Sequence, residues 1–259
     1  MNFAELLEHH ILDHRIHYLF PIGTIPVYLT RHGLMMLIVA VLLIAVLGIA
    51  RFQIKGGVPT GVANLIEVFI VYIRDEIVRP NLGDAGDSYL SYFCTLFFFI
   101  LLCNLLGLVP YGATATGNIS VTATLALTTF MMIHIAGIRK LGVWHYLKTY
   151  VPHGLPFWLV PLMFVIEVLG IFTKAFALCI RLFANMIAGH IVILAFLCLI
   201  FIMREIFHSS IVGVGVALGV SLPAVVGLGL LELFVAFLQA YIFTLLTAVF
   251  VGAAVNPQH

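Results

Sequence analysis

Residues 165–203 read VIEVLGIFTKAFALCIRLFANMIAGHIVILAFLCLIFIM, and this stretch decides the fold. It lies within an apolar run over about 159–203, which is roughly twice the ~20 residues that one bilayer-spanning helix needs. No strong turn signal interrupts the run, so we expect one long, steeply tilted helix rather than a helical hairpin. A second run of similar length, about 210–255, follows the polar break REIFHSS. It contains Pro223 and several glycines, which predict a kink.

The composition of the chain is that of an integral membrane protein. Of its 259 residues, 63% are apolar and 9% are charged, whereas soluble proteins average about 25% charged residues. We therefore expect an all-α, polytopic membrane protein with about five to six helices, including the two long ones. The net charge of +1 gives no reason to expect nucleic acid as a partner. No hydrophilic block is long enough for a soluble domain, so we expect no cofactor and no active site for bond chemistry on this chain.

Shorter apolar segments precede the long pair. They predict membrane-spanning helices at 33–50, 89–109 and 119–138. Residues 61–78 combine a helical apolar stripe with several charged side chains, which is typical of a helix at the membrane interface. A turn is expected at NLGDAGD, residues 81–87.

Basic side chains predict the orientation, because they are enriched in cytoplasmic loops. With the N-terminus outside and the chain crossing the membrane five times, the segments 51–88 and 139–158 face the cytoplasm. The basic residues in these two segments are Arg51, Lys55, Arg74, Arg79, Arg139, Lys140 and Lys148. The outer segments contain only Arg15, Arg31 and Arg204, while Lys174 and Arg181 lie within the membrane.

We expect residues 1–259 to form a single membrane domain in three parts. An N-terminal amphipathic segment covers 1–32, peripheral spanning and interfacial helices cover 33–158, and the long helical pair covers 159–255. The N-terminal segment has early acidic residues and no long apolar core, which is not the pattern of a secretory signal peptide.

Two groups of side chains raise the question of metal binding. His10, His14 and His17 follow helical spacing, and we interpret them as the polar face of a short interfacial helix rather than as metal ligands. The cysteines lie in apolar runs without CxxC spacing, which favours small buried side chains over a disulfide or metal role. They are Cys94, Cys103, Cys179 and Cys198.

The first long run carries a polar stripe. Glu167, Lys174 and Arg181 are spaced by seven residues, and Asn185 follows four later. At 100° per residue, these four side chains fall within about 40° of one another on a helix. Lys174 has the alternative of reaching a membrane interface with its long side chain. For Asn185, and for Gln239 in the second run, the alternative to a functional role is a structural one, in which the side chain forms a hydrogen bond between helices.

Arg181 needs a stronger explanation. A charge at membrane depth costs at least about 2.5–3.5 kcal/mol, and arginine cannot lose its proton to avoid that cost. The nearest acid in the run, Glu167, is 14 residues away. We therefore expect Arg181 to face an anion supplied by another chain.

His190 and Glu232 are titratable residues on the two neighbouring long helices. His190 points nearly opposite to Arg181 on the first helix, and Glu232 shares its face with Gln239 on the second. An intramembrane histidine and an acid can form a proton relay. From spacing alone, a static buried ion pair is the alternative.

Several motifs give the chain a resemblance to subunit a of the F-type ATP synthase. They are IRLFANMIAGH (180–190), LELFVAFLQAYIFTLLTAVFVG (231–252), NLLGLVP (104–110), NISVTATLAL (118–127) and GVPTGVANLIEVFI (57–70). They cover most of the chain in the family's order. Relatives in that family carry an acid at the position of His190 and a histidine at that of Glu232, or the arrangement found here, so the resemblance supports a functional pair.

The resemblance implies a proton-translocating stator with two aqueous half-channels beside a rotating c-subunit ring. Arg181 matches the family's essential arginine, whose partner is the c-subunit carboxylate. Asn185 and Gln239 match polar positions around it, Glu167 an acid of the exit side, and Lys174 a basic position of less defined role. The implied partners are the c-ring, the b subunits of the peripheral stalk, the soluble F1 head and the lipid bilayer. The implied location is a bacterial inner membrane, with the mitochondrial inner membrane as the alternative.

Other functions remain open at this stage. A stand-alone ion channel or secondary transporter is the main alternative, although no internal repeat of the transporter kind is evident. An intramembrane protease is not supported, because the sequence contains neither HExxH nor GxSxG. The unpaired arginine favours a subunit that works with a partner chain.

Overall fold

Two very long helices dominate the structure, a computed structural model that describes residues 15–22, 25–55, 58–109, 114–149, 158–206 and 211–256. They are α8 (Val160–Ile206) and α9 (Ile211–Val255), and each is a single helix over its whole length. The tilted-helix prediction is thus confirmed over the hairpin alternative. At about 1.5 Å per residue each helix is near 70 Å long, so neither can stand upright in a hydrocarbon core of about 30 Å.

The three shorter predicted spans are also present. They are α2 (Arg31–Gln53), α5 (Leu90–Gly107) and α6 (Ile119–Leu141). Within the described residues, five helices are long and apolar enough to cross a membrane. Local sequence fixes the starts of α2 and α6, since the Thr30 hydroxyl accepts a hydrogen bond from the Gly33 amide and the Asn118 side chain accepts one from the Ser120 amide. The fold is that of an all-α polytopic membrane protein.

The predicted interfacial helix at 61–78 has a more complex form. It consists of α3 (Val62–Tyr72) and a π-helical segment, η1 (Ile73–Val78), and it continues into α4 (Arg79–Leu82). The expected turn at 81–87 is largely a 3₁₀ helix, η2 (Gly83–Tyr89). A two-residue strand pair, β3 (Ile54–Lys55) and β4 (Val58–Pro59), connects α2 to α3.

The prediction of a helical N-terminal segment is wrong from Arg15 onward. Residues Arg15–Ile22 and Ile25–Thr30 form an antiparallel hairpin, β1–β2, and His17 therefore lies in a strand. The physical reason is that Pro21 and Pro26 flank the turn, and proline removes a helical N–H donor and clashes with the preceding turn. His10 and His14 lie outside the described residues.

A short helix, α7 (Val143–Thr149), lies in the segment 139–158, for which the sequence predicted no helix. It docks on α6 through Tyr146, whose ring packs so closely on Gly137 that a methyl group there would collide with it. The Tyr146 hydroxyl and Nδ1 of His134 also lie at hydrogen-bonding distance, 2.8 Å. Tertiary contacts thus stabilise a helix too short to be stable alone.

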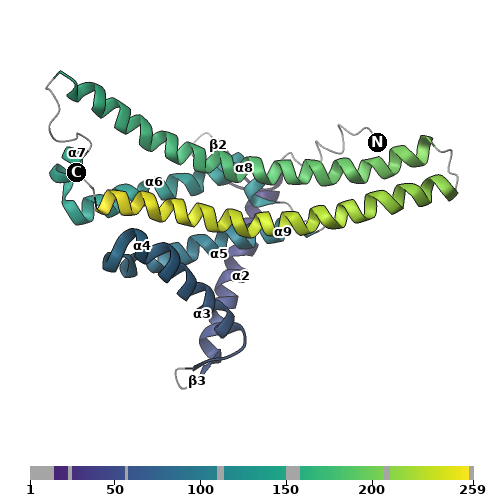
Figure 1. Ribbon diagram of the computed structural model, residues 1–259, viewed down its shortest axis with the longest axis horizontal. Helices are drawn as coiled ribbons and strands as arrows, with labels where there is room; N and C mark the ends of the chain where they lie inside the picture. Colours follow the sequence, from purple (N-terminus) through teal and green to yellow (C-terminus); the bar gives the residue numbers. More distant parts are fainter. Residues whose placement is uncertain are drawn as a thin grey trace.

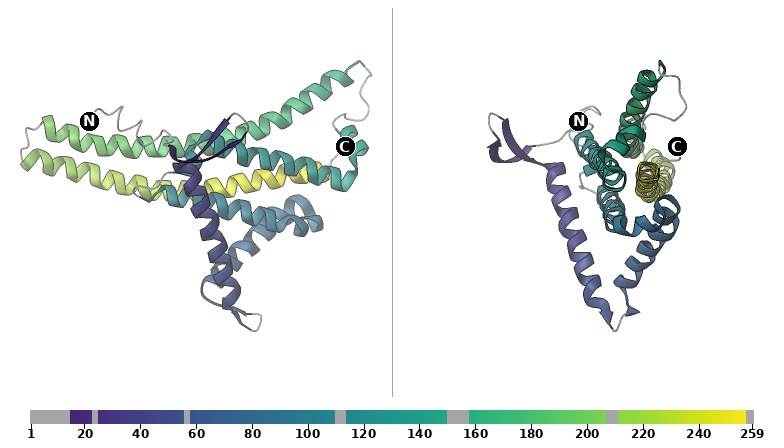
Figure 2. Two further views of the ribbon diagram at one scale, coloured as in Figure 1. Left: turned by 180° about the vertical axis from the view of Figure 1, so that it is seen from behind. Right: turned by 90° about the vertical axis from the view of Figure 1, so that its left-hand side faces the viewer.

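The core lies where α5 and α6 pack on the long pair. Figure 1 shows α8 and α9 side by side toward the α8–α9 connection and separating toward the α7 end, and Figure 2 shows α2 directed away from them. Contacts join α5 to α9 and join α6 to both long helices. The largest fully buried side chains here are Phe93, Phe97 and Phe243. This packing leaves one end of the long pair supported by α4–α7 and the other end uncovered by them.

Candidate functional site

The two long helices bring predicted polar residues together near their middle. Nδ2 of Asn185 on α8 donates a hydrogen bond of 2.8 Å to Oε1 of Gln239 on α9. Gln239 is buried, whereas Asn185 is exposed. This contact confirms the structural alternative that each amide bonds between helices, and it leaves a role in proton transfer open.

Arg181 lies one turn before Asn185 on α8. Its side chain is exposed, and it forms no hydrogen bond or ion pair with any residue that the structure describes. Neighbouring Leu182 is buried against the rest of the chain, so α8 turns its guanidinium outward. The position fits the sequence-based expectation that the counter-ion comes from another chain.

Glu232 packs against the turn of α8 that carries His190. A methyl group on Gly189 would collide with the Glu232 carboxylate, so only glycine allows this approach. Both carboxylate oxygens are buried without a hydrogen-bond partner among the described residues. The side chain of His190 lies outside the described part of α8, and the predicted pairing of His190 with Glu232 therefore stays a prediction.

A large cavity separates α8 from α9 toward the α7 end. Its volume is about 720 Å³, and Glu167 and Lys174 of α8 both line it. The Lys174 ammonium lies 5.4 Å from the centroid of the Phe250 ring on α9, within the range of a cation–π contact. Arg79 and Asn81 of α4 also line it. The predicted site residues therefore fall into two groups, with Arg181 between them along α8.

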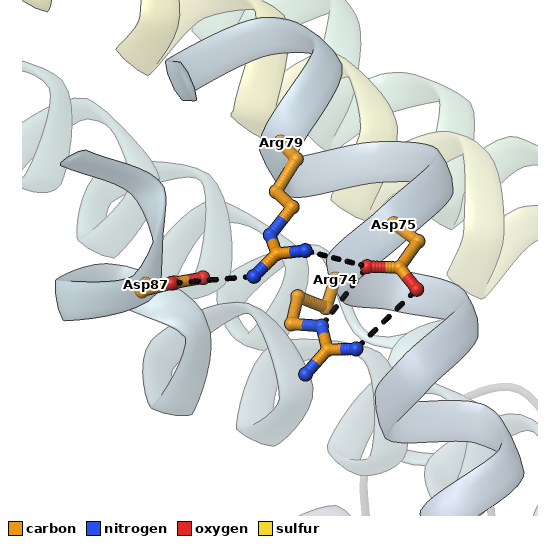
Figure 3. A network of polar contacts seen from close by, with 4 residues as sticks. All are labelled: Arg74, Asp75, Arg79 and Asp87. Atoms are coloured by element: carbon orange, nitrogen blue, oxygen red, sulfur yellow. Dashed lines mark hydrogen bonds and ion pairs between the residues drawn. The ribbon is translucent and has the colours of Figure 1, made fainter. Parts of the chain in front are cut away.

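Arg79 is held at the edge of this cavity by a surface network (Figure 3). Its guanidinium lies 3.4 Å from the Asp75 carboxylate and 3.6 Å from that of Asp87. Arg74 donates to Asp75 at 2.9 Å, and this hydrogen bond is the main reason that the pKa of Asp75 lies below its ordinary value. The charges are solvent-exposed, so we interpret the network as positioning Arg79 rather than as a reactive site.

Two buried residues near the Asn185–Gln239 contact, Asn104 and Thr116, were not predicted from the sequence. Asn104 of α5 donates to the backbone carbonyl of Ala236 on α9 at 3.2 Å, and it accepts from the Thr116 hydroxyl at 2.8 Å. Asn104 also lines a small cavity together with Asn185, Glu232 and Gln239. An amide inside the apolar run LLCNLLG was a usable signal, because polar groups at membrane depth need partners.

Metal and disulfide chemistry have no candidate in the described residues. No group of three or more His, Cys, Asp or Glu side chains there is placed to hold a metal ion. All four cysteines are free; Cys103 and Cys179 are buried, and Cys94 and Cys198 are partly buried. The prediction of small buried side chains is confirmed for Cys103 and Cys179.

Comparison with known proteins agrees with this arrangement. Residues 33–252 match the family described as ATP synthase A chain. The chain is 42% identical over 265 residues to "ATP synthase subunit a 2" of Chlorobaculum tepidum, covering 97% of this chain and 73% of the relative. It is 45% identical over 240 residues to "ATP synthase subunit a" of Myxococcus xanthus, covering 92% of this chain and 76% of the relative. These relatives are bacterial, and with five candidate spans they support a bacterial multi-pass membrane protein. The chain therefore belongs to the ATP synthase subunit a family.

Proposed function

We propose that this chain is the proton-conducting stator of a bacterial ATP synthase, with Arg181 facing the carboxylate of a passing c subunit. The observation that carries the proposal is the outward-facing, unpartnered guanidinium on a helix long and apolar enough to cross a membrane. Arginine keeps its charge, so an anion beside it is favoured in the ionised form. A ring carboxylate would release its proton on approaching Arg181 and would take up another after leaving.

The two groups of polar residues then serve as separate aqueous half-channels. The cavity beside Glu167 and Lys174 is lined by Arg79 and Thr149, from segments whose basic residues predict the cytoplasmic side. We assign it as the cytoplasmic half-channel. His190 and Glu232 line the outer one, since α8 continues past them toward the outer turn. Asn185 and Gln239 lie beside Arg181, whose fixed charge prevents protons from passing without rotation.

The remaining parts of the proposal concern assembly. The long helical pair, 159–255, faces the c-ring, whereas 33–158 supports it from behind within one membrane domain. The b subunits of the peripheral stalk keep the chain stationary relative to the soluble F1 head. The complex lies in the bacterial plasma membrane. A stand-alone channel, the alternative function, would not co-purify with a ring-forming small subunit.

Replacement of Arg181 tests the assignment. We expect Arg181→Ala to abolish ATP-driven proton pumping in membrane vesicles while the complex still assembles. Arg181→Lys should also fail or nearly so, because lysine loses its proton in a dry site and lacks the planar fork. Coupled pumping at the normal rate in the alanine variant would contradict the proposal.

An exchange of charges tests the outer pair. His190→Glu alone places two acids together and should slow proton flux through membranes stripped of the soluble head. Adding Glu232→His regenerates the pair in reverse and should restore much of the rate. If instead the damage of the two single variants simply adds in the double variant, the residues act independently.

A further inference from the structure

A three-member polar clamp joins α5, α9 and the short 3₁₀ helix η3 (Ala115–Gly117). Its members are the Thr116 hydroxyl, the Asn104 side chain and the backbone carbonyl of Ala236. Thr116 is 0%, Asn104 1% and Ala236 2% exposed, so bulk solvent does not reach these groups. In such surroundings each polar group needs its protein partner.

The chemistry of the three groups fixes the direction of every bond. The Ala236 carbonyl can only accept, so the Asn104 amide must present its NH₂ group to it. The amide oxygen then faces Thr116, and the threonine hydroxyl must donate. Without that hydroxyl, the hydrogen bond to Ala236 alone among the described contacts of Asn104 would hold its amide in this orientation.

The position of η3 is fixed by a close contact with the C-terminal end of α5. Thr114, just before η3, is buried and packs on Gly107 so closely that a methyl group on the glycine would collide with it. This approach brings η3 down onto α5 and places Thr116 within reach of Asn104. The clamp is therefore part of a tight local fold rather than a chance contact of two long side chains.

A small cavity lies directly beside the clamp, and its lining combines apolar side chains with four polar ones. Asn104, Asn185, Glu232 and Gln239 line it, and its volume is about 20 Å³. A cavity needs about 10–15 Å³ and two to four polar partners to hold a water molecule. Ala236 lies between Glu232 and Gln239 on one face of α9, so the clamp fixes the wall that carries both.

We propose that Thr116 and Asn104 are positioning residues that fix α9 at Ala236 and so keep this cavity at the size of one bound water molecule, hydrogen-bonded to the Glu232 carboxylate. The carboxylate of Glu232 supports a water molecule at this place, because both of its oxygens are buried without a partner among the described residues. Asn104 has a second amide proton beyond the one used by Ala236, and it lines the same cavity. The inference deepens the proposed function and rests on it, since it assigns the local environment of the outer half-channel.

A matched pair of variants at Thr116 tests the clamp. Thr116→Val keeps the shape but removes the donor, whereas Thr116→Ser keeps the donor. In vesicles that contain the complex without its soluble head, we expect Thr116→Val to conduct protons about fivefold more slowly, the factor that corresponds to one buried hydrogen bond. Thr116→Ser should conduct as the parent does. Equal proton conduction by the two variants would contradict the proposed role of the clamp.

A spectroscopic measurement separates positioning from a merely structural effect. The infrared carbonyl band of protonated Glu232, identified by its loss in Glu232→Gln, should move to higher frequency in Thr116→Val and stay in place in Thr116→Ser. Slower conduction with an unmoved band would overturn the water site. If Thr116→Val does not assemble, Thr116→Ala removes the same donor with less steric demand and is read in the same way.

The outcome is distinguishable from a failure of the stator assignment. Arg181→Ala, measured by ATP-driven pumping in vesicles that retain the soluble head, reports on the proposed function alone, because Arg181 does not line the small cavity. If Arg181→Ala abolishes pumping and Thr116→Val equals Thr116→Ser, the stator stands and the clamp fails. If Arg181→Ala pumps normally, the stator assignment fails whatever the Thr116 variants do.

Discussion

At the residue scale, Gly189 controls where the Glu232 carboxylate can lie. A methyl group at Gly189 would collide with the carboxylate, which is the far end of a flexible side chain. We therefore expect Gly189→Ala to displace Glu232 while the two long helices keep their packing. Misplacement of a reacting group by about 1 Å can cost up to about 100-fold in rate, so proton flux through head-stripped membranes should fall by about 10- to 100-fold.

The control for this variant is Gly170→Ala. Gly170 lies on the same helix, and a methyl group there meets no atom within 4 Å. Alanine is favoured over glycine within helices by about 0.5–1 kcal/mol, so Gly170→Ala should leave proton flux unchanged and thermal stability equal or higher. Flux in Gly189→Ala equal to that in Gly170→Ala would show that the position of Glu232 is not critical.

The sequence predicted on which helix face a polar residue lies better than it predicted which residues that side chain contacts. Periodicity placed Asn185 and Gln239 on faces that do meet, at 2.8 Å, because helical spacing is a regular function of residue number. It gave no role to Asn104 or Thr116, whose contact bridges α5 and a 3₁₀ helix. Such pairs depend on tertiary packing, which the pattern of one segment does not encode.

At the element scale, long apolar runs were predictable and short connections were not. The spans at 33–50, 89–109 and 119–138 correspond to α2, α5 and α6 within a few residues, since about 20 apolar residues have few alternatives in a membrane. The helix α7 was missed because seven residues cannot form a stable helix without tertiary contacts. The β1–β2 hairpin was not predicted, because the helical spacing of the histidines does not reveal that Pro21 and Pro26 oppose a helix there.

The approach of α9 to α4 gives a prediction at this scale. A methyl group at Gly252 would collide with the backbone carbonyl oxygen of Asn81, which is fixed within a helix. Overpacking of this kind costs about 1–3 kcal/mol, so Gly252→Ala should lower the thermal stability of the purified complex. Gly229→Ala on the same helix, where nothing lies within 4 Å, should not. Equal melting temperatures for the two variants would mean that α4 does not pack here.

At the scale of the whole molecule, the long pair is incompletely covered by its own chain. Of the apolar segment that qualifies α8 as a membrane span, 11% of the residues are buried, against 44% for α9. Large apolar side chains are exposed on both helices, among them Phe176, Leu231 and Phe234. Lipid can cover such a surface, but lipid offers no counter-ion for Arg181 at the same depth. A partner that is both apolar and acidic suits this surface better than lipid alone.

Disulfide cross-linking tests which face meets the proposed c-subunit ring. Ala184 on α8 and Leu238 on α9 are both exposed, and each adjoins a member of the Asn185–Gln239 hydrogen bond. In a background without the four native cysteines, we expect Ala184→Cys and Leu238→Cys to form disulfides with cysteines introduced beside the c-subunit carboxylate. Leu37→Cys, on α2, is the control: its side chain is 57% exposed, yet it lies on a helix directed away from the long pair. Cross-linking from Leu37→Cys without any from α8 or α9 would place the ring on the opposite side of the molecule. The two long helices would then need another reason for their length, and Arg181 would need another anion.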